Sequence, residues 1–520
     1  MKVKKEKLAP RLYRSGLVVS GLTMLSRVLG MGRDICIAYF FGSGTATDAF
    51  ILSFRIPNLF RRLFAEGAFS QAFVPVLTEY KQNKNHEAVR NLVNRTMGSL
   101  GMVLLIITII GMVLSETLVS VFAPGYLYSG AEEKLKLSAE LLTLTFPYLF
   151  LISMTALAGS VLNAYGRFAA PAFSPALLNL SLIGSAVFLR DRFSEPVFAL
   201  AWGVLIAGVA QLCWQMPSLF KINLIPRPKP GFRDSGVKRV GFLMLPAIFG
   251  ASVSQINILL DTVLASFLET GSLSWLYYSD RLLELPLALF GITIATIILP
   301  RLSSDHLKES NHDFSSTLDW ALRMIFLFGV PASASLLVLS DELIATLFFQ
   351  GAMTARDVSM AGASLAAYGA GLLGHMMVKV LAPGYFARQD MVSPVRFGVF
   401  AMVANMVMNL LFIWHFQHVG LAMATSISAF LNALLLYFGL RKSGLITFFT
   451  LGNFLFFLRL SVATLLMIFL ISYLNPPYDW WLEAGPYFRV VMMVGICFSG
   501  IASYFLFLVL SGFKLKSMLK

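Results

Sequence analysis

Residues 100–114 read LGMVLLIITIIGMVL, fifteen positions with one hydroxyl group and no charge. A strand of a membrane barrel would alternate polar and apolar side chains over about ten residues, and this stretch does not alternate. Because the hydrocarbon core offers no partner for backbone N–H and C=O groups, such a run is typical of a transmembrane helix. Of the 520 residues, 57% are hydrophobic and 13% are charged, about half the charge of soluble domains. The sequence therefore predicts an all-α integral membrane protein.

Similar apolar runs recur along the whole chain, many of them reaching the ~20 residues that a helix needs to cross a bilayer. Counted between polar breaks, they predict fourteen transmembrane helices. These lie near residues 16–43, 47–80, 90–122, 136–163, 169–190, 197–221, 238–268, 273–301, 316–339, 359–386, 392–415, 419–440, 450–474 and 487–511.

The net charge of +14 raises the question of a nucleic-acid partner. Its placement argues against one, because Lys and Arg gather at the ends of the apolar runs, as the positive-inside rule describes. Residues 1–15 and the tail after 511 are both basic, so we expect both termini in the cytoplasm. A cleaved signal peptide is disfavoured, since no small-residue cleavage site closes the first apolar run.

A basic, proline-rich segment at 223–236 interrupts the membrane pattern. We expect it to be a solvated cytoplasmic linker between an N-lobe at 16–222 and a C-lobe at 237–442. Two prolines at equivalent places, Pro75 and Pro300, lie 225 residues apart. This offset indicates a parallel repeat of two six-helix lobes, an arrangement found among transporters. Residues 443–520 would add two helices and a cytoplasmic tail.

Ionisable groups within the first two spans are the strongest functional signal, because each is costly at membrane depth and marks a pathway by default. Arginine exceeds acid there, with Arg27, Arg33, Arg55, Arg61 and Arg62 against Asp34, Asp48 and Glu66. Partners on one helix sit three or four positions apart. Arg62 can therefore pair with Glu66, and in the eighth span Arg281 can pair with Glu284. Asp34 directly follows Arg33 and should point about 100° away from it.

The remaining arginines need a partner from another helix, from water or from a ligand. For Arg55, a structural role, either snorkelling to the interface or an interhelical ion pair that sets packing, is as good an explanation as a place in a polar cavity. For Arg27, Arg33, Arg61 and Arg281 we favour a polar cavity, because a guanidinium grips phosphate oxygens bidentately. Prolines and glycines surround these arginines and predict bends in the first, second and eighth spans.

The second lobe offers a different set of polar groups. Asp261 has no basic residue at three or four positions, Asn405 and Asn409 are four apart, and Thr425 follows on the next span. These oxygens would suit Na⁺, although helix–helix hydrogen bonds explain Asn and Thr in spans equally well.

Three other patterns carry no function. The glycines at 369, 371 and 374 match G-x-G-x-x-G, yet no strand–helix unit surrounds them, and we expect close helix packing instead. His415 and His418 have no supporting ligands. His375 suggests a proton relay, but a single satisfied histidine is the simpler reading.

Several motifs together resemble one family. They are SRVLG at 26–30, GRD at 32–34, ATDAF at 46–50, PNL at 57–59, RRLFAEGAFSQAFVP at 61–75, YYSDRL at 277–282 and KVLAPG at 379–384. The sequence resembles, over essentially its whole length, the MurJ (MviN) family of lipid II flippases, within the MOP exporter superfamily.

This resemblance implies transport of lipid II, an undecaprenyl-pyrophosphate-linked muropeptide, from the inner to the outer leaflet of the bacterial cytoplasmic membrane. By motif, the substrate-binding residues would be Arg27, Arg33, Arg61, Arg281, Asp48, Glu66 and Asn58. Asp34, Asp280 and Glu284 would act in gating, and the last two helices would line a groove for the polyprenyl tail. Asp261, Asn405 and Thr425 match a sodium site of the family, in which Asn409 stands where an aspartate can occur.

We expect no enzymatic step and no bound cofactor. Alternating access would move the head group, with Na⁺, H⁺ or the membrane potential resetting the cycle. Partners would be lipid II, membrane lipids and other cell-wall synthesis proteins, with no nucleic acid. A polysaccharide-lipid flippase or a multidrug antiporter of the same fold, and a non-transporting scaffold, are the alternatives. The surplus of arginine disfavours a cationic-drug exporter, which should place carboxylates in its cavity.

Overall fold

The computed structural model describes residues 8–62, 69–308, 310–446, 448 and 453–513. Over these residues the chain is helical and contains no strand. It divides into two compact units, Met1–Gly271 and Ser272–Lys520. The units are described separately below, and the predicted lobe boundaries at 222 and 237 stay predictions.

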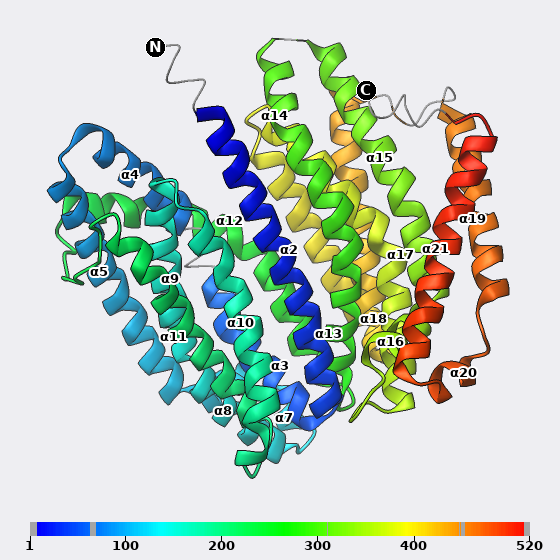
Figure 1. The fold of residues 1–520 in the computed structure, drawn as a ribbon, viewed down its shortest axis with the longest axis horizontal. Helices are drawn as coiled ribbons and strands as arrows, with labels where there is room; N and C mark the ends of the chain where they lie inside the picture. The colour runs from blue at the N-terminus through cyan, green and yellow to red at the C-terminus, as the bar shows by residue number, and fades with distance from the viewer. Residues whose placement is uncertain (1–7, 63–68, 309, 447, 449–452, 514–520) are drawn as a thin grey trace. The chain divides into compact units, whose positions relative to one another are not determined.

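Unit 1 begins with one long helix, α2 (Leu8–Phe41), which runs without interruption through Gly30 and Gly32. Neither glycine interrupts the helix, and the bend predicted in the first span stays a prediction. The second span is broken, as predicted, into α3 (Thr45–Arg61) and α4 (Ser70–Asn83). Helix α2 packs against α10 (Ala169–Phe188), and α10 packs against α11 (Phe198–Phe220), as Figure 1 shows.

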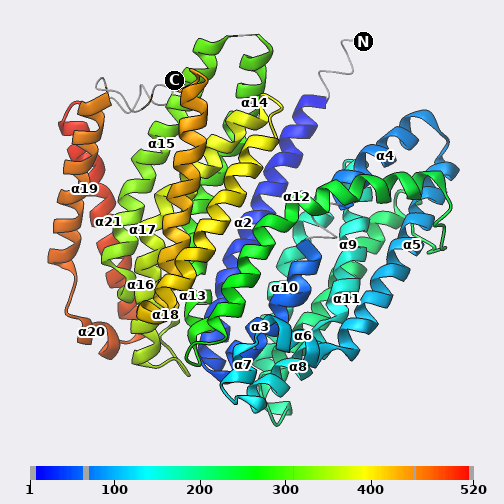
Figure 2. The ribbon, with the colours of Figure 1, turned by 180° about the vertical axis from the view of Figure 1, so that it is seen from behind.

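The other helices of unit 1 complete a bundle around these. They are α5 (His86–Val113), α6 (Ser115–Phe122), α7 (Gly125–Tyr128), α8 (Glu132–Thr145), α9 (Pro147–Ala164), the short η2 (Arg190–Arg192) and α12 (Ser235–Ala265). Its apolar core joins α2, α3, α8, α9, α10 and α11 through fully buried side chains such as Leu200 and Val204. Figure 2 shows α12 beside α4 and α5, which it contacts.

The segment at 223–236 is not a free tether. Asn94 of α5 accepts hydrogen bonds from two of its backbone amides, at Arg227 and Lys229, and Ser99 accepts one from Gly231. Asp234 then caps α12 by accepting from the amides of Gly236 and Val237. Most residues of the segment are exposed, as expected of a solvated linker, but its backbone donors also find acceptors on α5, a helix far away in sequence.

Unit 2 begins with α13 (Ser272–Pro286), which ends at the predicted proline bend and continues through a π-helical turn, η3 (Leu287–Ile292), into α14 (Thr293–Leu307). Three helices follow: α15 (Asn311–Val338), α16 (Ser340–Phe348) and α17 (Ala355–Phe386). The long α18 (Val392–Lys442) is two helices in one, because Gln417 has non-helical dihedral angles (φ 49°, ψ −130°). This break lies between the predicted eleventh and twelfth spans.

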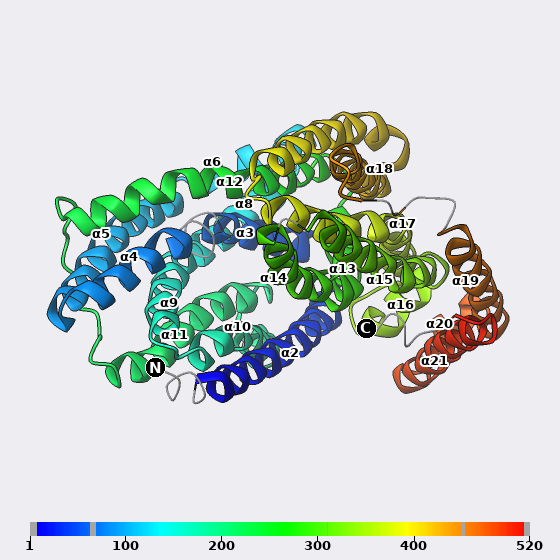
Figure 3. The same ribbon diagram turned by 90° about the horizontal axis from the view of Figure 1, so that it is seen from above.

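Close packing of α17 on α18 uses the glycines of the G-x-G-x-x-G pattern, as expected. A Cβ on Gly374 would lie 2.8 Å from the backbone nitrogen of Phe430. The chain then ends in α19 (Phe454–Leu474), the short α20 (Tyr478–Glu483) and α21 (Pro486–Leu510). Helices α19 and α21 lie side by side and contact α15 and α16, as Figure 3 shows from above.

Ten of the helical stretches are long and apolar enough to cross a membrane, judged by length and composition over the described residues. The predicted spans near 90–122, 136–163, 169–190 and 197–221 match α5–α6, α8–α9, α10 and α11. One of the ten is α18, which the break at Gln417 divides. An all-α membrane fold is confirmed, and the exact number of fourteen spans stays a prediction.

Candidate functional site

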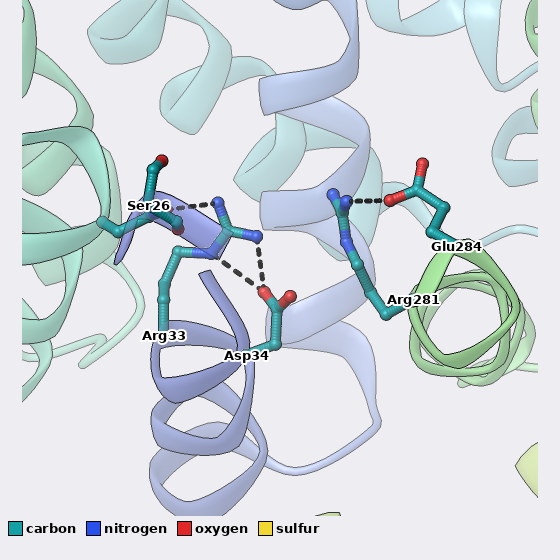
Figure 4. A network of polar contacts seen from close by, with 6 residues as sticks. Ser26, Arg33, Asp34, Arg281 and Glu284 are labelled. Carbon is teal, nitrogen blue, oxygen red and sulfur yellow. Dashed lines mark hydrogen bonds and ion pairs between the residues drawn. The ribbon is translucent and has the colours of Figure 1, made fainter. Parts of the chain in front are cut away.

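The strongest polar network of unit 1 forms where α2 meets α10. The Arg33 guanidinium donates to Asp34 Oδ1 through Nε (2.8 Å) and Nη2 (2.6 Å), and through Nη1 to Asn179 Oδ1 (3.1 Å). Asn179 donates in turn to the Ser26 carbonyl (2.9 Å), and Figure 4 shows these side chains converging. Arg33 and Asp34 are 7% and 1% exposed. A charge pair this deeply buried holds its geometry only with such supporting hydrogen bonds.

The prediction that Asp34 points away from Arg33 was wrong. Their Cβ atoms do leave the helix in different directions, but the long arginine side chain curls around α2 and reaches the carboxylate of its neighbour. The direction of the Cα–Cβ bonds therefore did not determine whether the two residues pair. The length of the arginine side chain did.

The predicted pair on α13 is confirmed. Arg281 Nη1 donates to Glu284 Oε2 at 2.9 Å, and its guanidinium lies 4.9 Å from the centre of the Tyr277 ring. Figure 4 shows this pair as well. The side chains of Arg281 and Glu284 are 34% and 52% exposed, so this charge pair is far more accessible than that of Arg33. Asp280, the neighbouring candidate, is exposed.

The other arginines of unit 1 have different environments. Arg27 is exposed. Arg55 of α3 donates to Thr262 Oγ1 of α12 at 2.9 Å, which is an interhelical contact rather than snorkelling. Arg61 donates through Nε to Asn58 Oδ1 at 2.7 Å, so these two predicted substrate-binding residues lie together. Glu66, and with it the predicted pair to Arg62, lies outside the described residues.

Asp48 lies in a second buried network, at the start of α3. Its Oδ2 accepts from Lys134 Nζ of α8 and from the backbone amide of Gly271, both at 2.8 Å. Lys134 Nζ also lies 4.7 Å from the centre of the Tyr126 ring. Burial, together with the Asp48 charge, raises the pKa of the Tyr126 phenol well above 10, so it stays protonated. Asp48 is therefore neutralised within unit 1 by a lysine.

The proposed sodium ligands are only partly together. In unit 2, Asn409 Nδ2 donates to Asn405 Oδ1 at 3.1 Å, and Asn405 Nδ2 reaches Thr425 Oγ1 at 3.5 Å. These are neutral groups that hydrogen-bond to one another, which fits helix–helix contacts. Asp261, the acidic member of the set, belongs to unit 1, and no carboxylate joins the three within the described part of unit 2 as a ligand cluster. The residues of unit 2 alone do not make a Na⁺ site, and no step is assigned to one.

Sequence reasoning missed two residues that the networks depend on. Asn179 links Arg33 of α2 to α10, and Lys134 is the counter-charge of Asp48. Asn179 is a lone amide in the apolar run of α10, which was a signal that it needs a partner. Lys134 stands in a mixed-charge stretch, Glu132–Glu133–Lys134, where nothing local singles it out.

The histidines set aside differ in their contacts. His418 contacts the carbonyl oxygen of Met360 at 3.0 Å, and its ring lies tilted against that of Trp275, with the centres 4.9 Å apart. His375 Nε2 is buried without a hydrogen-bond partner among the described residues, so the expectation of a satisfied histidine is not confirmed. No group of three or more metal-ligating side chains occurs among the residues described. The geometry allows an exchange of anions. The guanidinium groups of Arg33 on α2 and Arg281 on α13 are each paired with a carboxylate, and each can bind another anion in its place.

Comparison with known proteins identifies a family. A model described as "Lipid II flippase MurJ" matches residues 37–485. A protein of Vibrio cholerae named "Probable lipid II flippase MurJ" is 46% identical over 98% of both chains. One of Burkholderia cenocepacia named "Lipid II flippase MurJ" is 40% identical over 97% of this chain and 98% of its own.

Solved structures agree with this family. "Lipid II flippase MurJ, inward closed conformation" superposes with a TM-score of 0.78 at 26% identity, covering 94% of this chain and 98% of that one. A multidrug resistance MATE family transporter of the MOP superfamily, in an inward-facing conformation, gives a TM-score of 0.67 at 13% identity, covering 82% and 98%. That second likeness shows the fold alone. With its arginine motifs lying on α2, α3 and α13 and its relatives matched from end to end, the chain belongs to the lipid II flippase MurJ family.

Proposed function

We propose that this chain is a flippase that moves lipid II from the inner to the outer leaflet of the bacterial inner membrane. The observation that carries the proposal is an arginine held at 7% exposure on α2, the predicted first span, within a family whose members are named for this activity. The chain acts as a transporter, and its multi-pass helices place it in the membrane. The basic residues at both ends support cytoplasmic termini.

The first step of the proposed mechanism is an exchange of partners at Arg33. In this structure Asp34 occupies two of its N–H donors. A pyrophosphate offers more oxygens and more charge than one carboxylate, and a planar guanidinium binds it bidentately. Displacing Asp34 costs that carboxylate its two bonds to Arg33. The pair forms again when the head group leaves, and this is the gating role that we propose for Asp34.

The two arginine pairs differ in how easily they open. Breaking a buried pair by removing one partner costs about 3–5 kcal/mol, whereas an exposed i,i+3 pair contributes only about 0.3–0.5 kcal/mol. Arg281, whose partner Glu284 is half exposed, is therefore the readily available site. Arg33 needs a strongly binding anion. We infer that Arg281 engages the pyrophosphate loosely, with Asp280 and Glu284 in gating, and that Arg33 holds it during translocation.

The other predicted residues complete the proposal. Arg61 with Asn58, Arg27, Asp48 and Glu66 contribute to binding, and inward-open and outward-open states alternate. The membrane potential, worth about 2.3 kcal/mol per charge per 100 mV, is a sufficient source for the reset, with Na⁺ or H⁺ as the other candidates. Lipid II and membrane lipids are the partners, and the polyprenyl tail would follow a groove along α19 and α21. Other cell-wall synthesis proteins are further candidates.

The experiment is complementation in cells depleted of their own flippase, with lipid II measured separately in the two leaflets. Arg33→Ala and Arg281→Ala should each abolish outer-leaflet lipid II at normal expression. Arg33→Lys should restore part of the activity at most, since it keeps the charge but loses the fork. The matched control is Arg192→Ala, which removes an exposed arginine of unit 1. Full translocation by both alanine variants would refute the arginine assignments.

A further inference from the structure

A cavity of about 400 Å³ lies inside unit 1, next to the C-terminal end of α3. Its size is within the ordinary range for small-molecule sites, about 300–1,000 Å³, and far exceeds the ~30 Å³ that one water occupies. Three helices each present one face to it, through residues three or four positions apart. These are Thr155, Gly159 and Asn163 on α9, Pro171, Ser174 and Leu178 on α10, and Gln211 and Gln215 on α11.

On α11, the cavity wall contains a buried hydrogen-bond acceptor, the side-chain oxygen of Gln215, that has no donor among the described residues. Gln215 is 1% exposed, and its Nε2 donates to Ser174 Oγ at 3.0 Å. Its Oε1, which also lines the cavity, has no hydrogen-bond partner among the described residues. Gln211 is held more fully, because it donates to the Ser174 carbonyl at 2.8 Å and accepts from Tyr148. Buried polar atoms are almost always paired, so Gln215 Oε1 indicates a donor that comes from a ligand.

The charge of the lining narrows the class of ligand. Among the lining residues, Arg61 alone is charged, and the rest of the polar lining consists of hydroxyl and amide groups. Ser70 and Ser160 face each other there at 2.6 Å. Such a wall suits a neutral group rich in hydroxyl or amide N–H donors, attached to an anion that meets Arg61. The described residues of the wall offer no carboxylate to a cation.

The space in front of Gln215 is open because residue 159 is a glycine and has no side chain. A Cβ built on Gly159 would lie 3.6 Å from Gln215 Oε1 and 3.4 Å from Pro171 Cβ. These are ordinary van der Waals distances, so an alanine fits the fold. Its methyl group would stand where a donor must approach the glutamine oxygen.

We propose that this cavity is a sugar subsite, in which a hydroxyl or acetamido N–H of a phosphate-linked saccharide donates to Gln215 Oε1 while the attached phosphate lies at Arg61. The inference rests on the proposed function, because it takes the ligand to be a lipid-linked sugar phosphate. It adds that unit 1 recognises the saccharide of the ligand as well as its charged phosphate.

The test compares two radiolabelled ligands in equilibrium binding to the full-length protein in detergent: the polyprenyl pyrophosphate-linked disaccharide, and bare polyprenyl pyrophosphate of the same chain length. Gln215→Leu removes the acceptor and keeps the bulk. It should weaken binding of the sugar-bearing ligand roughly 2- to 12-fold, the worth of one hydrogen bond, and leave the bare pyrophosphate unchanged. Gly159→Ala should act in the same direction without loss of thermal stability.

Gly184→Ala is the matched control, since it also adds a methyl group to a helix of unit 1 but meets no atom within 4 Å. Equal weakening of both ligands by Gln215→Leu and Gly159→Ala, or no weakening of either, would overturn the subsite. If Gln215→Leu unfolds, Gly159→Ala decides the question alone. Translocation by the unmodified protein is measured in parallel in vesicles. Its failure would reject the proposed function, while the difference between the two ligands tests the cavity independently.

Discussion

The buried pair of Asp48 and Lys134 allows the sharpest test of the structure of unit 1. Their side chains are 1% and 7% exposed, at 2.8 Å from each other. Lys134→Met keeps the length of the side chain and removes the amine, so that Asp48 loses its charged partner and keeps the hydrogen bond from the Gly271 amide. Removing one partner of a buried pair costs about 3–5 kcal/mol. At roughly 2–4 °C per kcal/mol for a body of this size, the thermal midpoint should fall by about 6–20 °C.

The measurement is thermal unfolding of the purified protein in detergent, at a fixed pH near 7. The double variant Asp48→Asn/Lys134→Met removes both charges and keeps an oxygen for the Gly271 amide. It should be more stable than Lys134→Met alone, because it leaves no uncompensated charge. A midpoint shift below about 2 °C in Lys134→Met, or a double variant whose loss equals the sum of the two single losses, would refute the reasoning.

Three further predictions concern unit 2. Burial raises the pKa of Asp341, on α16 between two membrane helices, to about 6. A carboxyl group whose folded-state pKa is raised stabilises the fold less as pH rises, so the thermal unfolding midpoint should decrease as the pH is raised from about 4 to about 7. Asp341→Asn should flatten that pH profile. Arg489 donates through Nη1 to the carbonyls of Ala345 (2.9 Å) and Phe349 (2.7 Å); Arg489→Ala should speed hydrogen exchange in α16 at least tenfold, by loss of charge-assisted bonds worth over 1.4 kcal/mol. Gly374→Ala should cost about 1–3 kcal/mol through overpacking, whereas Gly398→Ala, with open space around it, should cost nothing in the same unfolding assay.

Much of the fold could be predicted from the sequence because membrane helices obey local rules. An apolar run of sufficient length forms its own hydrogen bonds, so α5, α10 and α11 appear where their sequences place them. The break at Pro286 followed from a local rule too, since proline removes a backbone donor. Glycine is a weaker signal than proline, because it permits a bend without requiring one, and α2 stays helical through Gly30 and Gly32.

The candidate site was only partly predictable, because its pairing depends on contacts between distant segments. The Arg281–Glu284 pair follows from spacing on one helix. Asn179 lies 146 residues from Arg33, and Lys134 lies 86 from Asp48; no local pattern specifies either partner. The same holds for the 223–236 segment, whose amides bond to α5.

The attachment of the C-terminal hairpin to α16 has a consequence for biogenesis. Asn475 donates to Glu342 at 2.6 Å, and Arg489 donates to the carbonyl groups of Ala345 and Phe349, the nearer of which lies 140 residues earlier in the chain. At about 5–20 residues per second, a ribosome takes roughly 7–28 s to make that stretch. During this interval α16 has been synthesised, but the residues that hydrogen-bond to it, Asn475 and Arg489, have not. Unit 2 can therefore complete these contacts only after its last helix is inserted.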